Sequence, residues 1–303
     1  MLLAGPHAIP VSAVADDSSA FLELHFLDVG QGDAVLIRTP DGRAVLYDGG
    51  QDGERLLGHL EAKGVETLEL VIASHNHADH IGGLITVIER YRPRYVMENG
   101  IPHTTRTYER FLRAIAAAGS LRLDAHRRVI TLDSMALTVI PPQGDPTRGQ
   151  NDNSVGIRVE YGEFQATLLG DSERAQQRWW IEHHPDLLGP VQVHKASHHG
   201  SRNGDTEELL EMLRPAIVVI GVGRNNRYGH PHASALERYC QIDTEVYRTD
   251  RHGTITVSAR PDGTILVATR RQNRPSRTCS RRRPSRRRIT RSGSTGTFSG
   301  SGT

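Results

Sequence analysis

Residues 74–83 read SHNHADHIGG and follow directly on a run of four apolar residues, LVIA. Within this stretch four side chains can bind a metal ion: His75, His77, Asp79 and His80. At the end of an extended strand His75 and His77 alternate, so both can point the same way. Asp79 and His80 come where the chain turns into a helix, so they face a second point in space. The spacing therefore predicts that one short loop supplies ligands for two metal ions.

The donor types agree with this interpretation. Two imidazoles suit zinc, manganese or iron, and a carboxylate beside an imidazole makes a neighbouring site with an open position for water. Histidines scattered over a polar surface turn would not explain the ordered H-x-H-x-D-H spacing after a buried strand. We therefore expect two divalent metal ions, zinc or manganese, as cofactors.

The rest of the chain reads as strands and helices in two similar series. The first series predicts strands over 22–27, 34–37, 44–47, 68–73 and 95–98, helices over 54–62, 80–91 and 106–118, and a strand pair over 129–132 and 135–140. The second predicts strands over 155–161, 164–169, 191–195, 216–221, 246–248, 254–257 and 264–268, with helices over 173–183, 206–213 and 233–240. A meander followed by alternating strands and helices, twice over, predicts two sheets packed face to face with helices outside, in one α/β domain over 21–269.

Three further segments place metal-capable side chains at strand ends. Asp48 ends a strand in YDGG, and Asp171 ends one in LLGDSE. His198 and His199 follow another strand in KASHHGS. Loops at strand ends are where enzymes hold catalytic groups on rigid supports. Asp171 could bridge two metals roughly 3.5 to 4 Å apart, and an imidazole from the HHG segment could complete the second site.

Seven blocks, taken in order, carry a resemblance to a known family. They are FLDVGQGDAVLIRTPDG at 26–42, YDGG at 47–50, SHNHADHIGGL at 74–84, NDNSVGIRV at 151–159, LLGDSE at 168–173, KASHHGS at 195–201 and NRYGHPH at 226–232. Together they resemble the metallo-β-lactamase superfamily, and within it the branch of the C-terminal domain of ComEC competence proteins and of bacterial phosphorylcholine esterases. The resemblance implies an αββα sandwich with a dinuclear site at one edge.

The resemblance also implies how the ligands divide. It assigns His75 and His77 to one metal, Asp79, His80 and His199 to the other, Asp171 to a bridge between them, and Asp48 to orienting the metal loop. The third histidine that the superfamily places on the first metal is missing, and Asn151, Asp152 or Asn153 occupies its approximate position. This departure makes the first metal more exchangeable and argues against β-lactam hydrolysis.

Several other residues are candidates for contacts with substrate. His198 or His230 could protonate a leaving oxygen, alongside Asp79 as a catalytic ligand. Glu173 could accept a cationic group or cap the helix that follows it. The remaining candidates are Asn153 near the missing ligand, and Arg224, Arg227 and His232, which form either a phosphate-binding rim or a solvated basic turn. Asp33 is a weak candidate in a tight turn, and other histidines, His25, His59, His103 and His194 among them, read as ordinary.

These patterns predict a dinuclear metal-dependent hydrolase of phosphodiesters, with DNA or another nucleic acid as the favoured substrate. The alternative within enzymes is a small-molecule esterase, such as a phosphorylcholine or lactone hydrolase, for which Glu173 would hold a quaternary ammonium. The alternative from another class is a non-catalytic nucleic-acid-binding protein that acts through an arginine-rich tail.

That tail dominates the charge distribution. The 303-residue chain has a formal net charge of +2, yet residues 270–291 hold eleven arginines and no acid follows Asp262, so the rest of the chain carries about −9. Residues 270–303 lack apolar periodicity and are expected to be disordered, either binding nucleic acid by phosphate neutralisation or acting as a solubilising extension.

The N-terminal segment leaves the compartment open. Residues 1–20 contain an A-x-A pattern at 13–15 that resembles a signal-peptide cleavage site, but no basic residue precedes it. We interpret the segment as a leader or signal-peptide remnant, which would make the protein secreted, and otherwise expect it in the cytoplasm. No apolar run reaches the length of a transmembrane helix.

Overall fold

The computed structural model describes residues 21–273 and residue 275. The predicted leader at 1–20, residue 274 and the tail from 276 lie outside the described residues. In chain order the first half contains β1 (Leu22–Phe26), β2 (Val35–Arg38), β3 (Ala44–Tyr47), α1 (Gly53–Ala62), β4 (Leu70–Ile72), α2 (Ala78–Tyr91), β5 (Tyr95–Glu98), α3 (Arg106–Ala118), β6 (Leu121–Asp124), β7 (Val129–Leu132) and β8 (Met135–Ile140). The second half contains β9 (Gly156–Tyr161), β10 (Phe164–Leu168), α4 (Arg174–His183), β11 (Val193–Lys195), α5 (Glu207–Leu213), β12 (Ile217–Ile220), α6 (Ala233–Gln241), β13 (Glu245–Arg248), α7 (Thr249–His252), β14 (Ile255–Ala259) and β15 (Ile265–Thr269).

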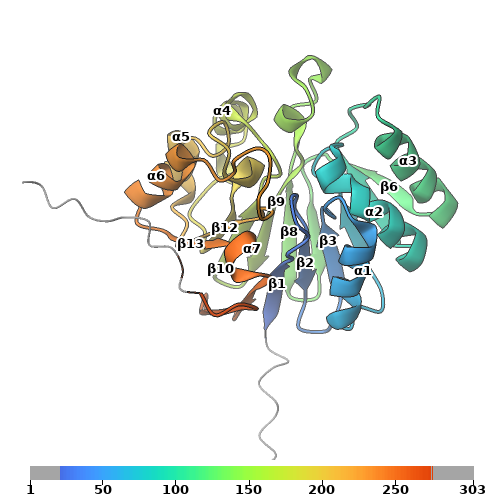
Figure 1. Cartoon of the computed structure of the whole chain (residues 1–303), viewed down its shortest axis with the longest axis horizontal. Coiled ribbons are helices and arrows are strands. Elements are labelled where there is room, and N and C mark those ends of the chain that lie inside the picture. Colours follow the sequence, from blue (N-terminus) through green and yellow to red (C-terminus); the bar gives the residue numbers. More distant parts are fainter. Residues whose placement is uncertain (1–20, 274, 276–303) are drawn as a thin grey trace, which may run out of the picture.

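Two β-sheets lie face to face between two layers of helices (Figure 1). The first sheet has the strand order β15-β14-β1-β2-β3-β4-β5-β6, and the second has the order β13-β12-β11-β10-β9-β8-β7. Helices α1, α2 and α3 cover the outer face of the first sheet, while α4, α5 and α6 cover the outer face of the second. This arrangement is the αββα sandwich that the sequence predicts.

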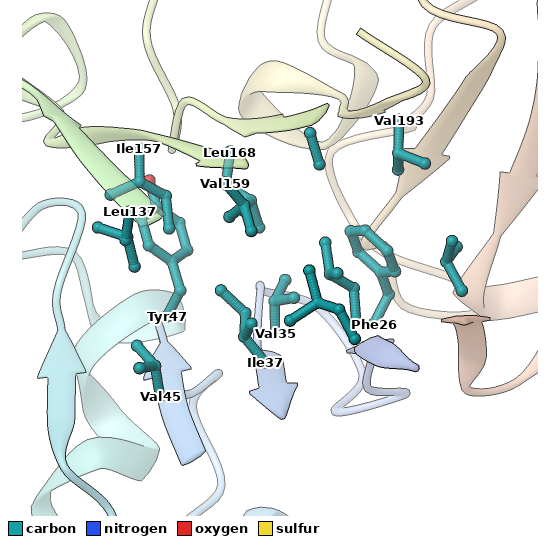
Figure 2. Close-up of a cluster of buried hydrophobic side chains, with 14 of the residues drawn as sticks. Phe26, Val35, Ile37, Val45, Tyr47, Leu137, Ile157, Val159, Leu168 and Val193 are labelled. Atoms are coloured by element: carbon teal, nitrogen blue, oxygen red, sulfur yellow. The ribbon is translucent and has the colours of Figure 1, made fainter. Parts of the chain in front are cut away.

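The main core lies between the two sheets (Figure 2). The side chains that meet there include Phe26, Val35, Ile37, Val45 and Tyr47 from the first sheet and Leu137, Ile157, Val159, Leu168 and Val193 from the second. Successive strand residues point to opposite faces, so alternate residues Leu22, Leu24 and Phe26 of β1 reach this core and are at most 3% exposed. The Tyr47 hydroxyl also donates a hydrogen bond of 2.7 Å to the Val155 carbonyl, which ties the two sheets together.

The outer helices start and stop at residues with the right local chemistry. The Asp52 side chain accepts a hydrogen bond of 3.1 Å from the Arg55 amide and begins α1. Thr105 caps α3 in the same way through the Tyr108 amide, and Gly119 ends that helix in the left-handed conformation at φ 70°. Each helix therefore presents an apolar face of fixed length to its sheet.

Parallel strands bring several loops to one edge of the sandwich. β3 and β4 run parallel in the first sheet, and β10, β11 and β12 run parallel in the second. Because the carboxyl ends of parallel strands lie at the same edge, the loops that follow these five strands gather there. All of the strand-end candidates from the sequence lie in these loops.

Two short elements differ from the expected pattern. β6 is an edge strand paired in parallel with β5, and its sequence LRLD is mostly exposed, so it carries little of the apolar signal that marks buried strands. α7 is a single turn between β13 and β14.

The chain also stays hydrogen-bonded past β15, since the amides of Arg270 and Arg271 donate to the carbonyls of Thr254 and His252. Among the described residues, no helix is long and apolar enough to cross a membrane.

Candidate metal centre

The turn after β3 and the start of α2 fit together through glycines. A Cβ atom on Gly49 would lie 2.6 Å from the Leu84 side chain, and one on Gly83 would lie 2.1 Å from the Gly49 carbonyl oxygen. Neither approach leaves room for a side chain. The YDGG and HIGGL segments therefore pack backbone to backbone, which brings Asp48 under the histidine loop.

Asp48 organises that loop from below. Its carboxylate is fully buried and accepts hydrogen bonds from the Ser74 amide at 2.7 Å and the Ser74 hydroxyl at 2.8 Å. His80 Nδ1 lies 2.8 Å from the same carboxylate, which leaves His80 Nε2 directed away from it. A carboxylate that orients a histidine in this way is the usual support of a metal ligand.

Residues of the second sheet meet His80 from the opposite side. Asp171 follows β10, and its Oδ2 atom lies 3.2 Å from His80 Nε2 and 3.3 Å from His199 Nε2. His199 has a left-handed φ of 54°, and its Nδ1 lies 2.9 Å from the Gly221 carbonyl oxygen, which fixes the ring. His199 Nε2 is also 3.5 Å from Asp79 Oδ2. Imidazoles from both halves of the chain, those of His80 and His199, thus lie beside the same carboxylate oxygen, Asp171 Oδ2.

The other two histidines of the motif extend this cluster. His75 Nε2 lies 4.0 Å from Asp171 Oδ2 and 3.0 Å from His77 Nδ1. His75 is fully buried, whereas His77 is partly exposed at the start of α2. The structure therefore brings together all six residues that the sequence predicts as metal ligands.

The unsatisfied atoms of the cluster test whether metal ions fit. His80 Nε2 and His199 Nε2 are buried and have no hydrogen-bond partner among the described residues. Although burial alone would lower it, the carboxylates of Asp171 and Asp48 raise the pKa of His80 well above its ordinary value. The same carboxylates that hold a proton on His80 would attract a divalent ion in its place. Imidazoles and carboxylates are ligands that zinc and manganese accept. The donor set fits divalent metals.

A buried ion pair flanks the cluster, and sequence reasoning undervalued it. Asp33, His80, Asp171 and His199 offer ligand atoms that all lie within 4.8 Å of one another. The Lys195 ammonium, only 1% exposed, forms an ion pair with Asp33, donates to the Gly170 carbonyl at 2.8 Å and lies 3.8 Å from Asp171 Oδ1. Lys195 was not singled out by the sequence, although a lysine that ends a strand within the VQVHK segment was a usable signal.

A pocket of about 380 Å³ opens over these ligands. Its lining includes the metal-ligand candidates His77, Asp79, Asp171 and His199, together with Gln31, Asn151, His198 and His230. Of Asn151, Asp152 and Asn153, the three residues near the expected position of the missing histidine, only Asn151 is among the described residues that line the pocket. His103 and Tyr228 also line it, and sequence reasoning missed both: it treated His103 as ordinary, yet its ring centroid lies 5.6 Å from that of His77.

The substrate candidates divide between the pocket and its surroundings. His198 Nδ1 lies 2.9 Å from Glu173 Oε1, and Glu173 also accepts from the Asn151 side chain at 3.2 Å. Glu173 precedes α4, but its side chain makes no capping hydrogen bond there. Burial and the neighbouring imidazoles of His199 and His198 lower the pKa of His230 to about 4, so this ring is neutral near pH 7.

Like Glu173, four further candidates are not among the residues that line the pocket. The Asn153 amide is buried and bonds the backbone of Asp145 and Gly149, so it shapes the preceding loop instead. Arg224 donates to the Asp250 carbonyl, Arg227 donates to the Tyr228 hydroxyl, and His232 Nδ1 accepts from the Arg202 amide. Arg224 and His232 thus bond backbone groups, whereas Arg227 lies against the side chain of Tyr228.

Comparisons with known proteins agree with this geometry. Residues 27–224 match the model of the metallo-β-lactamase superfamily. ComE operon protein 3 of Bacillus subtilis is 28% identical over 254 residues, which is 77% of this chain and 32% of that protein. Recombination protein 2 of Haemophilus influenzae is 31% identical over 239 residues, 77% of this chain and 28% of that protein. The chain thus spans about a third of the length of these relatives.

Solved structures support the fold alone. The diiron β-hydroxylase CmlA of Streptomyces venezuelae superimposes with a TM-score of 0.54 at 16% identity, over 79% of this chain and 54% of that one. The metallo-β-lactamase fold protein YhfI of Bacillus subtilis gives a TM-score of 0.50 at 14% identity, over 82% of this chain and 100% of that one. With the family match, the sandwich and the ligand cluster in agreement, the chain belongs to the metallo-β-lactamase superfamily.

Proposed function

We propose that the protein is a dinuclear metal-dependent hydrolase that cleaves phosphodiester bonds, with a nucleic-acid strand as the favoured substrate. The observation that carries this proposal is the meeting of imidazoles from both sheets on Asp171 Oδ2, at the floor of an open pocket. In this proposal His75 and His77 hold one ion, Asp79, His80 and His199 hold the second, and Asp171 bridges them. When bound, the two ions would acidify water and offset the charge of a phosphodiester.

The pocket rim supplies the groups that such a reaction requires. His198 lies against Glu173 through Nδ1, while its Nε2 is 3.9 Å from Asp171 Oδ2 and so faces the pocket. Glu173 would fix the ring with a proton on Nδ1, and when Nε2 carries a second proton, that proton is the one that passes to the leaving oxygen. His230, neutral near pH 7, would offer a hydrogen bond to a non-bridging oxygen.

The missing third histidine bears on which substrate is favoured. Asn151, one of the three residues near its expected position, lines the pocket and contributes a neutral amide. A first metal with fewer protein ligands keeps more positions open for anionic phosphate oxygens, which favours a phosphodiester over a β-lactam. Two of the relatives are named for the ComE operon and for recombination, and recombination is a process of nucleic acids. These names support a nucleic-acid substrate.

The esterase alternative has weaker support. A quaternary ammonium would need a free carboxylate or an aromatic cage. Glu173 is already engaged by His198 and Asn151, and Tyr228 stacks on His230 with ring centroids 5.7 Å apart. The arrangement therefore favours a phosphate group over a choline group.

A single preparation can test the proposal. The purified chain would be loaded with zinc or manganese, analysed for metal content, and assayed with bis(p-nitrophenyl) phosphate, a single-stranded oligonucleotide, nitrocefin and p-nitrophenylphosphorylcholine. We expect up to two ions per chain and metal-dependent turnover of the first two substrates. Efficient nitrocefin turnover, or turnover confined to the choline ester, would contradict the proposal.

A further inference from the structure

A second cavity, of about 620 Å³, lies between α1 and the outer face of β14 and β15. The helix contributes Arg55, Gly58, His59, Ala62 and Lys63. These residues follow one another at the spacing i, i+3, i+4, i+7 and i+8, so they form one face of the helix. The opposite side is formed by Thr254, Thr256, Ala268, Thr269 and Arg270. We call this cavity the basic groove.

The lining of the basic groove is cationic and polar. None of its described lining residues is acidic, whereas Arg55, Lys63 and Arg270 carry positive charge. Burial lowers the pKa of His59, so that ring adds hydrogen-bonding capacity and no charge near pH 7. The strand side offers small side chains and hydroxyl groups, which leave the groove open to a ligand.

The nearest acids offset these cations only in part. Asp28 lies 2.9 Å from the Arg55 guanidinium and 3.1 Å from that of Arg271, so two positive groups share one carboxylate. Glu23 lies 3.3 Å from His25 Nε2 on the adjacent strand. With Lys63 and Arg270 added, the cations around the groove outnumber the acids by two. A surface of this kind attracts anions.

One short loop separates the basic groove from the metal pocket. A Cβ atom on Gly30 would lie 3.4 Å from the Arg55 guanidinium, which places Arg55 against that residue. The next residue, Gln31, lines the metal pocket, and Gly32 packs against the Asp79 carbonyl. An anionic chain that enters the pocket could therefore continue over this loop into the groove.

We propose that the basic groove binds phosphate groups of the nucleic-acid strand whose scissile phosphodiester lies at the metal centre; this inference rests on the proposed function. A strand repeats its phosphates along its length, so one strand can occupy both cavities. The arginine run of residues 270–291 begins at the groove with Arg270, and its like charge excludes the run itself as the occupant. A membrane surface would require apolar insertion as well as charge, and the strand side presents threonines instead.

A matched pair of double variants separates this role from general electrostatics. Lys63→Ala with Arg270→Ala removes two cations of the groove, and Arg110→Ala with Arg113→Ala removes two exposed cations from α3. Binding of a fluorescent single-stranded oligonucleotide to the full chain would be measured by anisotropy over a salt series in EDTA, so that binding does not depend on turnover. Each lost phosphate contact should flatten the slope of log Kobs against log salt by about 0.7.

The groove variant should lose about 1.4 in slope and bind on the order of tenfold more weakly at low salt, while the α3 variant stays near wild type. With metals restored, the KM of the groove variant for the oligonucleotide should rise, and the kcat/KM of the groove variant for bis(p-nitrophenyl) phosphate should not change. Equal oligonucleotide affinity in the two double variants would overturn the inference. The groove variant would also be tested for binding to phosphatidylglycerol vesicles and to inorganic phosphate. If it lost affinity for one of these and kept its affinity for the oligonucleotide, the inference would be wrong. An affinity loss in a protein that turns over no phosphodiester would support the groove and reject the proposed function.

Discussion

The metal pocket and the basic groove lie on two sides of one loop and are built in opposite ways. In the pocket, His80, His199 and Asp171 are at most 3% exposed, and other protein groups fix each of them. In the groove, Arg55 and Arg270 are exposed. Chemistry on a substrate requires donors held within fractions of an ångström, whereas attraction of a polyanion requires net charge near its path. The pocket is therefore expected to be sensitive to single substitutions and the groove tolerant of them.

Asp171→Asn should have the largest effect, because in the proposed centre both metal ions depend on this carboxylate. Loss of the carboxylate should remove several kcal/mol of transition-state stabilisation, so turnover should fall on the order of 10³-fold. Bound metal should fall below two ions per chain. Metal analysis with steady-state kinetics on bis(p-nitrophenyl) phosphate measures both. Asp186→Asn, an exposed carboxylate paired with Arg127, is the matched control and should behave as wild type. A variant that retains two ions and wild-type turnover would remove Asp171 from the centre.

Lys195→Met beside the pocket should lower the free energy of unfolding far more than Lys63→Ala in the groove. It leaves Asp33 buried without its cation, which should cost about 3–5 kcal/mol of the free energy of unfolding. Lys63→Ala removes the same group from the groove, where the cost should stay within about 0.5 kcal/mol. Urea denaturation of the metal-free proteins measures both. If the Asp33→Asn/Lys195→Met double variant is no more stable than the sum of the single changes predicts, the two side chains are not coupled.

A smaller effect is expected beneath the HHG loop. Asp205 is buried and accepts hydrogen bonds from the Tyr239 hydroxyl at 2.6 Å and the Ser197 amide at 3.1 Å, while His194 Nε2 lies 3.0 Å away. Although burial alone would raise it, His194 and these hydrogen bonds lower the pKa of Asp205 below its usual 3.8. Asp205→Asn should therefore cost about 1–3 kcal/mol of unfolding free energy at pH 7.

The pH dependence of that cost follows from the direction of the shift. The stabilisation by Asp205 is fully present above the unfolded pKa and is lost as the pH falls through the lower folded value. The difference between wild type and Asp205→Asn should be the same at pH 7 and pH 5 and should shrink below about pH 4. Urea denaturation at pH 7, 5 and 3 measures it. A gap that grows on acidification would show that Asp205 is not the stabilising anion.

The contiguous part of the site was predictable from the sequence. His75, His77, Asp79 and His80 share one strand end, so their spacing alone indicated their common target. The αββα fold was predictable because strands covered by helices on one face and by the other sheet on the opposite face read as short apolar runs, such as AVLY at 44–47 and IVVI at 217–220. The pairing of Asp33 with Lys195 was not, because Asp33 precedes β2 and Lys195 ends β11 of the other sheet, so the two side chains meet only when the sheets pack. His103 and Tyr228 likewise reach the pocket only through the packing of separate loops.

The division of the ligand set between two sheets links metal supply to the integrity of the fold. His75 comes from the loop after β4 and His80 from the first turn of α2, whereas Asp171 and His199 come from loops of the other sheet, so the cluster exists only while both sheets are docked. Metal ions would then bind the folded chain and not the unfolded one. Each tenfold rise in free metal above the dissociation constant would add about 1.4 kcal/mol of stability for each ion bound. The free metal concentration around the protein would thus set how long the chain survives proteolysis, as well as how fast it works.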